Sequence, residues 1–228
     1  MKAVLKREIC AYFRTPLGYV IISAMYFFTY NIFGNTTETA PLFAMLFSVA
    51  LFLVPVLTMR LLSEERRMKT DIALLTSPVS RFGIVIGKYI AALCVYALAI
   101  SGTLVMALVL QYYSQPDWPV VFGNFTGLLL LGSALIAVCL FISSLTENQV
   151  VATVGGFAAS LFLILLDAMY HVVSNRTLRI LFTHMSFNRR YRGFTIGVAD
   201  FADICFFISI AAFFVCMTAV VLERRRWV

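Results

Sequence analysis

Residues 118–146 read W-P-V-V-F-G-N-F-T-G-L-L-L-L-G-S-A-L-I-A-V-C-L-F-I-S-S-L-T, without one charged side chain. A helix rises about 1.5 Å per residue, so about 20 apolar residues cross a hydrocarbon layer of roughly 30 Å. Five more charge-free stretches of comparable length lie at 15–37, 39–59, 89–116, 148–166 and 204–222. A membrane β-barrel would instead alternate polar and apolar residues over segments of about 10 residues. The sequence therefore predicts an all-α integral membrane protein with six transmembrane helices.

The composition agrees with a membrane protein. Hydrophobic residues make up 61% of the 228 residues and charged residues 13%, whereas soluble domains carry about 25% charge. The length leaves little room for a separate soluble domain, so we expect one transmembrane domain over residues 1–228. The five cysteines are odd in number and contain no C-x-x-C pair, which indicates neither a disulfide framework nor a zinc site.

The positive charges predict the orientation. With both termini in the cytoplasm, 13 of the 18 Lys and Arg residues lie on the cytoplasmic side, before the first span, between the second and third, and after the last. The other five lie together between the fifth and sixth spans. Because this bias explains the net charge of +7, no nucleic-acid partner is predicted.

An amphipathic helix is predicted over residues 1–14, at the membrane interface. Its apolar residues recur at helical spacing, while Lys2, Lys6 and Arg14 fall on another face. Pro16 and Gly18 are expected to break the helix before the first span. The apolar residues of this predicted helix are Leu5, Ile9, Tyr12 and Phe13.

The long segment 60–88 contains a second predicted helix. Ser63 is expected to cap it, with Glu64 and Glu65 in the first turn. Its apolar patch is Ile72, Leu74 and Leu75, and Pro78 ends it. This mixed-charge segment is either a solvated connection or a docking surface for a soluble partner. Lys88 is interpreted as a snorkelling anchor where the next span enters the membrane.

Catalytic signatures are missing from the sequence. The closest approach to a phosphate loop, G-I-V-I-G-K-Y at residues 83–89, has the wrong glycine spacing and lacks the Ser or Thr after the Lys. No cofactor is therefore predicted in this chain. If nucleotide hydrolysis drives the protein, another chain must perform it.

Two further sets of residues have open interpretations. Asp167 follows an apolar run and is either an interfacial carboxylate near His171 or Arg176 or part of an external gate. The pairs Gly155 with Ala159 and Gly156 with Ser160 are spaced for close helix packing, either within the chain or in a dimer. The segment 172–203 is expected to lie outside the membrane between spans five and six.

Four blocks of sequence together resemble a known family. They are K-R-E-I-C-A-Y-F-R-T-P-L-G-Y-V near the start, L-V-P-V-L-T-M-R-L-L-S-E-E-R-R-M-K-T-D-I-A-L-L-T-S-P-V-S-R-F-G-I-V-I-G-K-Y in the middle, then I-S-S-L-T-E-N-Q-V-V-A, and L-E-R-R-R-W at the end. The chain resembles ABC-2 type transporter permeases, and within them the gliding-motility-associated permease subunits. The resemblance implies an ABC-2, or type V exporter-like, permease fold in the bacterial cytoplasmic (inner) membrane.

The resemblance also implies partners and site residues. Members pair with a second permease copy and with two cytoplasmic ABC ATPase subunits that bind ATP and magnesium, and the gliding-motility branch adds an extracytoplasmic accessory subunit. Residues 1–14 correspond to the elbow helix and 60–88 to the coupling segment. The implied ATPase contacts are Glu64, Glu65, Arg66, Arg67, Met68, Lys69, Asp71, Leu74 and Leu75.

Three functions are compared. The first is a non-catalytic permease subunit that couples a separate ATPase to export or to work on an external partner. The alternative is an ATP-independent carrier or channel, which would show charged or broken helices along a path. An intramembrane enzyme is disfavoured because no Ser/His signature is present.

Overall fold

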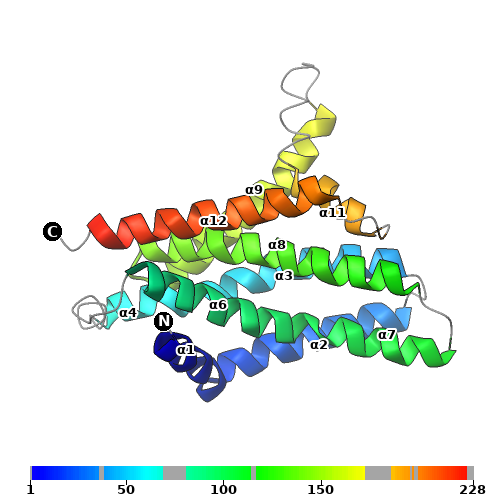
Figure 1. Cartoon of the computed structure of the whole chain (residues 1–228), viewed down its shortest axis with the longest axis horizontal. Helices are drawn as coiled ribbons and strands as arrows, with labels where there is room; N and C mark the ends of the chain where they lie inside the picture. The colour runs from blue at the N-terminus through cyan, green and yellow to red at the C-terminus, as the bar shows by residue number, and fades with distance from the viewer. Residues whose placement is uncertain are drawn as a thin grey trace.

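The computed structural model describes residues 2–35, 39–68, 81–113, 117–172, 186–195, 197 and 200–224. All regular secondary structure in these residues is helical, and the long helices run side by side in a bundle (Figure 1). The first half of the chain forms α1 (Lys2–Arg14), α2 (Pro16–Asn35), α3 (Thr39–Thr58), α4 (Arg60–Arg67) and α6 (Arg81–Ile100). The second half forms α7 (Gly102–Tyr113), α8 (Trp118–Leu145), α9 (Gln149–Val172), α11 (Phe187–Thr195) and α12 (Phe201–Arg224).

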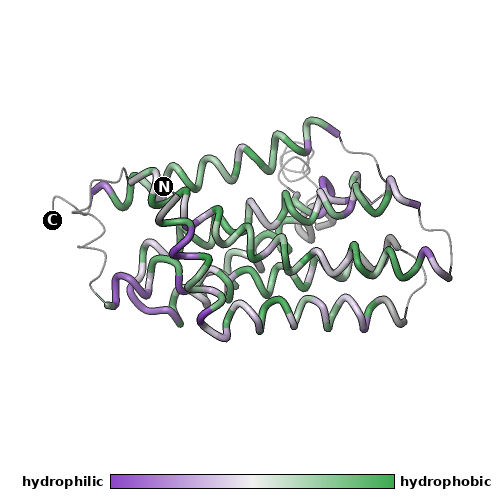
Figure 2. Tube along the Cα trace, turned by 60° about the horizontal axis from the view of Figure 1, so that its bottom comes forward, coloured by the Kyte–Doolittle hydropathy of each residue, from purple (hydrophilic) through white to green (hydrophobic). Residues whose placement is uncertain are grey.

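Among the residues that the structure describes, five helical stretches are long and apolar enough to cross a membrane: Met45–Arg67, Phe82–Tyr112, Trp118–Leu145, Gln149–Leu166 and Phe201–Arg224. The predicted all-helical, multi-pass membrane architecture is therefore confirmed. The first predicted span falls in α2, which is not one of the five, so the count of six remains a prediction. Hydrophilic residues gather near the ends of the helices and the middle is hydrophobic (Figure 2).

The corner between α1 and α2 forms where the sequence predicts a break. Pro16 begins α2, a position at which the missing backbone N–H costs no helical hydrogen bond. A Cβ on Gly18 would lie 2.6 Å from the carbonyl oxygen of Tyr12, so only glycine allows the two helices to turn this closely. The α1 helix, α4 and the last turn of α12 lie at one end of the bundle, called here the α4 end (Figure 1).

The second span continues directly into α4. Met59 between them has helical angles (φ −53°, ψ −34°), and its N–H donates to the Pro55 carbonyl at 3.0 Å. The predicted cap at Ser63 is therefore wrong, because the chain is already helical before this residue. The Ser63 hydroxyl instead donates to the Met59 carbonyl one turn back.

The core is built around α8, and its glycines receive large aromatic side chains. A Cβ on Gly132 would lie 2.0 Å from Cε1 of Tyr96, whose ring from α6 fills that space. Phe194 of α11 packs against Gly127 in the same way, and a Cβ on Gly127 would lie 2.8 Å from the Cβ of Phe194. The Tyr96 hydroxyl donates to the Leu128 carbonyl at 3.1 Å, so the buried polar group is satisfied.

The segment between the last two spans is shorter and more structured than the sequence suggests. Of the predicted external segment 172–203, residues 187–195 form α11, and α12 already begins at Phe201. Asp203 therefore belongs to the last span, where it pairs with Arg190 of α11 at 2.7 Å. The predicted start of the last span, at residue 204, was too late because the charge-free stretch excluded Asp203. The helix tolerates this carboxylate because Arg190 pairs with it.

Candidate functional site

A buried lysine joins three helices at the α4 end of the bundle. Lys88 of α6 has a side chain only 1% exposed, although it lies about two turns into an apolar helix. Its Nζ donates to Glu8 Oε1 of α1 at 3.2 Å and to the Leu61 carbonyl of α4 at 2.7 Å, and it lies 2.9 Å from Glu65 Oε1 of α4. Three acceptors match the three donors of an ammonium group. The interpretation of Lys88 as a snorkelling anchor is wrong, because its charge is neutralised inside the protein.

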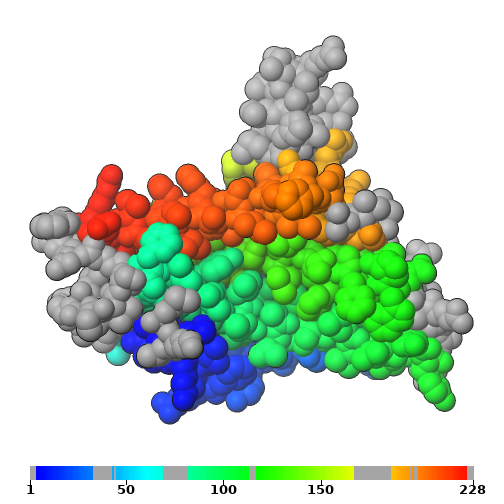
Figure 3. Space-filling model, viewed as in Figure 1, coloured from blue at the N-terminus to red at the C-terminus, as the bar shows by residue number. Residues whose placement is uncertain are grey.

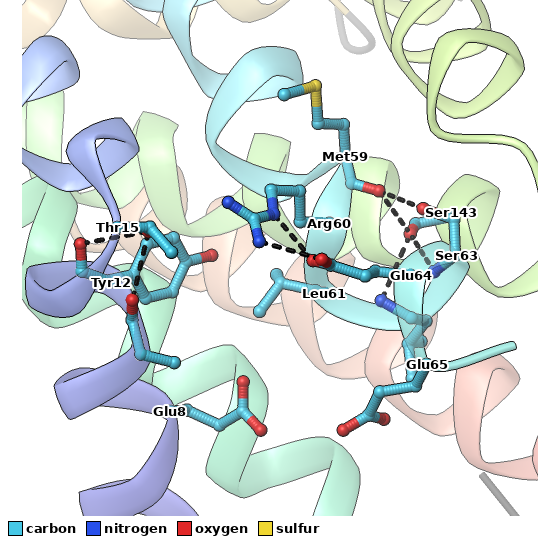
Figure 4. A network of polar contacts seen from close by, with 12 residues as sticks. Glu8, Tyr12, Thr15, Met59, Arg60, Leu61, Ser63, Glu64, Glu65 and Ser143 are labelled. Carbon is cyan, nitrogen blue, oxygen red and sulfur yellow. Dashed lines mark hydrogen bonds and ion pairs between the residues drawn. The ribbon is translucent and has the colours of Figure 1, made fainter. Parts of the chain in front are cut away.

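Arg7 of α1 completes a neutral group of four charges. Its Nη2 lies 2.6 Å from Glu8 Oε1 and 2.7 Å from Glu65 Oε1, so each carboxylate contacts both cations. Glu8 and Glu65 point toward each other across the space between α1 and α4 (Figure 4). We call Arg7, Glu8, Glu65 and Lys88 the junction network. Removing one member would leave a partly buried charge short of a partner.

Tyr12 holds α1 to the last turn of α3. Its hydroxyl donates to the Leu57 carbonyl at 2.9 Å, and the side chain is buried. Burial, and secondarily the Glu8 carboxylate, raise the pKa of the Tyr12 phenol. The phenol therefore stays protonated and remains a donor.

A small polar cavity adjoins the junction network. Its volume is about 60 Å³, and α1 and α4 both line it. On the α4 side, Arg60 and Glu64 form a two-pronged ion pair with distances of 2.6 and 2.8 Å. A cavity of this size and polarity has room for water, which would hydrate these partly exposed charges.

On its other flank, α4 is tied to α8 and to the turn before α9. The fully buried Ser143 hydroxyl accepts from the N–H groups of Leu62 and Ser63 at 3.4 and 3.2 Å and donates to the Met59 carbonyl at 3.3 Å. Arg66 pairs with Glu147 at 2.9 Å. Contacts on both flanks hold α4 against α1, α6 and α8, so a displacement of α4 must move or break them.

The structure separates the predicted coupling residues into two groups. Glu64, Glu65 and Arg66 make the intramolecular ion pairs just described, whereas Arg67 and Met68 are exposed, Met68 to 68%. Lys69, Asp71, Leu74 and Leu75 lie outside the described residues, as do Ile72 and Pro78. Their role in ATPase contact remains a prediction.

The residues predicted as the elbow helix form α1, but the buried face of α1 differs from the predicted one, and its role as an elbow helix remains a prediction. Tyr12 is buried, while Leu5, Ile9 and Phe13 are half-buried on a neighbouring face. Val4 and Glu8 complete the buried face with Tyr12 at intervals of four residues. A Cβ on Gly87 of α6 would lie 3.2 Å from Val4 Cγ1, which shows how closely α1 packs there.

The small residues of α9 pack within the chain. A Cβ on Gly155 would lie 2.8 Å from Ile142 of α8, and one on Gly156 would lie 2.9 Å from Pro55 of α3. Ser160 is buried, and Ala159 is half-buried. Intramolecular packing thus accounts for both glycines, and the dimer contact remains a prediction.

The structure does not describe the side chains of the predicted gate residues. Asp167 and His171 belong to α9, but their side chains lie outside the described part of the chain, as does Arg176. Their role therefore stays an expectation from the sequence.

Arg7, Glu8 and Lys88 are the members of the junction network that the sequence reasoning did not assign to a site. The signal was present: Lys88 is a lone charge within the apolar run Phe82–Ala92, and an isolated charge in such a helix requires a partner. Glu8 likewise falls on the same helical face as Val4 and Tyr12. Which residues pair with Lys88 depends on the fold, because Glu8 and Glu65 lie 80 and 23 residues before it in the sequence.

Comparison with protein families identifies the chain. The family described as ABC-2 family transporter protein matches residues 11–222, which include every described helix from α2 to α11 and nearly all of α12. No curated protein matches the chain. The chain therefore belongs to the ABC-2 family of transporter proteins.

Proposed function

We propose that this chain is the membrane permease subunit of an ABC transporter, driven by a separate cytoplasmic ATPase. In this proposal it lies in the bacterial cytoplasmic membrane with the α4 end in the cytoplasm. Two ATPase subunits bind ATP and magnesium and act on two permease copies. The chain itself performs no catalysis.

The junction network is the observation that carries the coupling proposal. Because α4 is an unbroken extension of α3, a force applied to α4 acts directly on a membrane span. Lys88 and Glu65 extend that connection to α6 and, through Glu8 and Arg7, to α1. Three of the four side chains in the network are less than one-fifth exposed, so the network has a strong preference for its own geometry and transmits a displacement instead of absorbing it.

The proposal divides the coupling segment by role. Glu64, Glu65 and Arg66 hold α4 in place, while Arg67 and Met68, at its exposed end, begin the ATPase contact. The contact continues through residues 69–75, with Leu74 and Leu75 as its apolar anchors. The resemblance to gliding-motility-associated permeases adds an extracytoplasmic accessory subunit to the proposed assembly.

Purification of the tagged chain from its native membrane, followed by identification of its partners, tests this function. We expect a cassette ATPase to co-purify and the complex to hydrolyse ATP. The chain freed of that partner should neither bind nor hydrolyse ATP. A preparation that transports or conducts without any ATPase partner would favour the carrier or channel alternative and contradict the proposal.

A further inference from the structure

A break in the helix interrupts one membrane-spanning stretch of the bundle. The stretch Phe82–Tyr112 is long and apolar enough to cross a membrane, yet α6 ends before Ser101 and α7 begins after it. The Ser101 N–H is shared between the carbonyls of Ala97 and Leu98, at 3.0 and 3.3 Å, so the regular ladder of helical hydrogen bonds is disturbed at this residue. A serine next to a glycine is a common cause of a bend in a helix.

Two hydroxyl groups bond to backbone carbonyls around the break. The Leu104 N–H, which would donate to the Ile100 carbonyl in an unbroken helix, donates to the Ser101 carbonyl at 3.0 Å. The Thr103 hydroxyl donates to the Ile100 carbonyl at 2.7 Å. The Ser101 hydroxyl donates to the Leu98 carbonyl, also at 2.7 Å. Such side chains compete with the helical ladder, and in a membrane they supply the hydrogen bonds that lipid does not, so the backbone can bend here with both carbonyls satisfied.

One side chain of α2 contacts both residues of the break. The Tyr26 hydroxyl lies 3.0 Å from Ser101 Oγ, and Tyr26 is the donor because the Ser101 hydrogen already goes to Leu98. The Tyr26 ring lies against Gly102, where an added Cβ would lie 3.1 Å from three ring carbons. Glycine leaves room for the ring, so Tyr26 holds α7 to α2 at the point where the ladder is disturbed.

The two sides of the break are held differently. On α6, Lys88 bonds to α1 and α4, and the Tyr96 hydroxyl bonds to α8. On α7, Leu108 and Val109 are exposed to 58% and 48%, and the last turn of this helix, green at the lower right of Figure 3, projects beyond its neighbours. Lipid tails are as apolar as these side chains, so moving α7 from protein into lipid costs packing contacts but little hydrophobic free energy.

We propose that Ser101 and Gly102 form a hinge, latched by Tyr26, on which α7 swings away from α2 while α6 stays in the bundle. Release of the latch opens the bundle between α2 and α7, at the end opposite the α4 end (Figure 1). A swing of about 20° moves Gln111, about 15 Å along the helix from Ser101, through about 5 Å. The hinge is a property of this chain alone and does not rest on the ATPase coupling.

Electron spin resonance distance measurements on the full chain in lipid nanodiscs test the hinge. One spin label replaces the exposed Gln111 on α7 and the other replaces Tyr30 on α2, which is 65% exposed. The four native cysteines that are not buried are first changed to alanine. We expect the distances to divide into a shorter population and a longer one, greater by up to about 5 Å.

The Tyr26→Phe variant keeps the ring against Gly102 and removes the hydroxyl that bonds to Ser101. We expect it to raise the ratio of the longer to the shorter population about three- to tenfold, the effect of losing one hydrogen bond. The matched control is Tyr19→Phe, the same change at an exposed tyrosine of α2, which should leave this ratio unchanged.

A second pair of labels reports on the α4 end of the bundle. It replaces Phe82 on α6 and Leu145 on α8, which are exposed to 46% and 53%. Because neither residue lies beyond the break, their distance should stay the same in every variant and show that the bundle is intact.

Three results would overturn the proposal. A single distance between positions 30 and 111, the same in the labelled parent chain and in Tyr26→Phe, would mean that the break is a fixed bend. An equal change with Tyr19→Phe would show that the Tyr26 hydroxyl is no latch. A change between positions 82 and 145 with Tyr26→Phe would mean that the bundle loosens as a whole. None of these results depends on whether an ATPase is bound.

Discussion

Lys88→Met removes the charge at the centre of the junction network while keeping most of the side-chain volume. In the native chain two cations face two carboxylates, so the network is neutral. The variant leaves Glu8 and Glu65, each less than one-fifth exposed, with Arg7 as their shared partner. Removing one partner of a buried pair costs about 3–5 kcal/mol, and we expect about 3 kcal/mol because Arg7 remains.

A double-mutant cycle with Glu65→Gln isolates the interaction. Glu65→Gln alone leaves Lys88 bonded to Glu8 and the Leu61 carbonyl, so we expect a loss of about 1.5–3 kcal/mol. The double variant restores neutrality, with Arg7 and Glu8 still paired at 2.6 Å. Its cost should therefore be at least about 1 kcal/mol below the sum of the single costs.

The assay is reversible unfolding of the purified chain in mixed micelles, which gives each variant's change in unfolding free energy. Lys6→Met is the matched control, because Lys6 is exposed on the same helix as Arg7, and it should change stability by less than about 0.5 kcal/mol. Costs for Lys88→Met and Glu65→Gln that add to within about 0.5 kcal/mol would show that the two side chains do not interact. That result would contradict the proposed junction network.

Three further predictions concern other parts of the bundle. Ser143→Ala removes the hydroxyl that bonds α4 to α8 and should cost about 1–3 kcal/mol in the same assay, whereas a neutral result would mean that Ser143 does not hold α4. Gly132→Ala places a Cβ 2.0 Å from the Tyr96 ring and should cost about 1–3 kcal/mol, and Tyr96→Leu in the same chain should recover part of this loss by making room. A cysteine introduced at Ser77 should resist impermeant thiol reagents added outside intact cells, and labelling from outside would reverse the proposed orientation.

The membrane class could be predicted because it depends only on long runs without charge. Element boundaries could not be predicted where a charge is neutralised by a distant residue. Lys88 marked the edge of the third predicted span and Asp203 the edge of the last, yet both lie within helices because Glu8, Glu65 and Arg190 pair with them. Counting charges treats every charged residue as the end of a span. A paired charge inside a membrane helix, however, costs much less free energy than an unpaired one.

The candidate site was predictable as a segment and not as a set of contacts. The sequence singled out Glu64, Glu65 and Arg66, and these residues do lie at a junction of helices. Glu64 pairs with Arg60 one turn back on the same helix, whereas Glu65 and Arg66 pair with Arg7, Lys88 and Glu147 on other elements, which were not predicted. Spacing along one helix indicates which residues share a face, but the partner across that face depends on how the helices pack.

We propose that the coupling segment binds a separate ATPase, and one double variant tests this contact. Leu74→Asp with Leu75→Asp should place two unpaired charges in that contact, at a cost of several kcal/mol. Since about 1.4 kcal/mol corresponds to a tenfold change in affinity, the ATPase should no longer co-purify. Membrane insertion should persist, because both residues lie outside every charge-free stretch.

The matched control is Thr36→Asp with Thr37→Asp, the same added charge in the connection predicted on the opposite side of the membrane. The decisive measurement is the amount of ATPase, and its ATP hydrolysis, recovered with each tagged variant. We expect loss of both with the Leu74 and Leu75 variant and normal recovery with the Thr36 and Thr37 control. Normal ATPase recovery and hydrolysis with the Leu74 and Leu75 variant would contradict it.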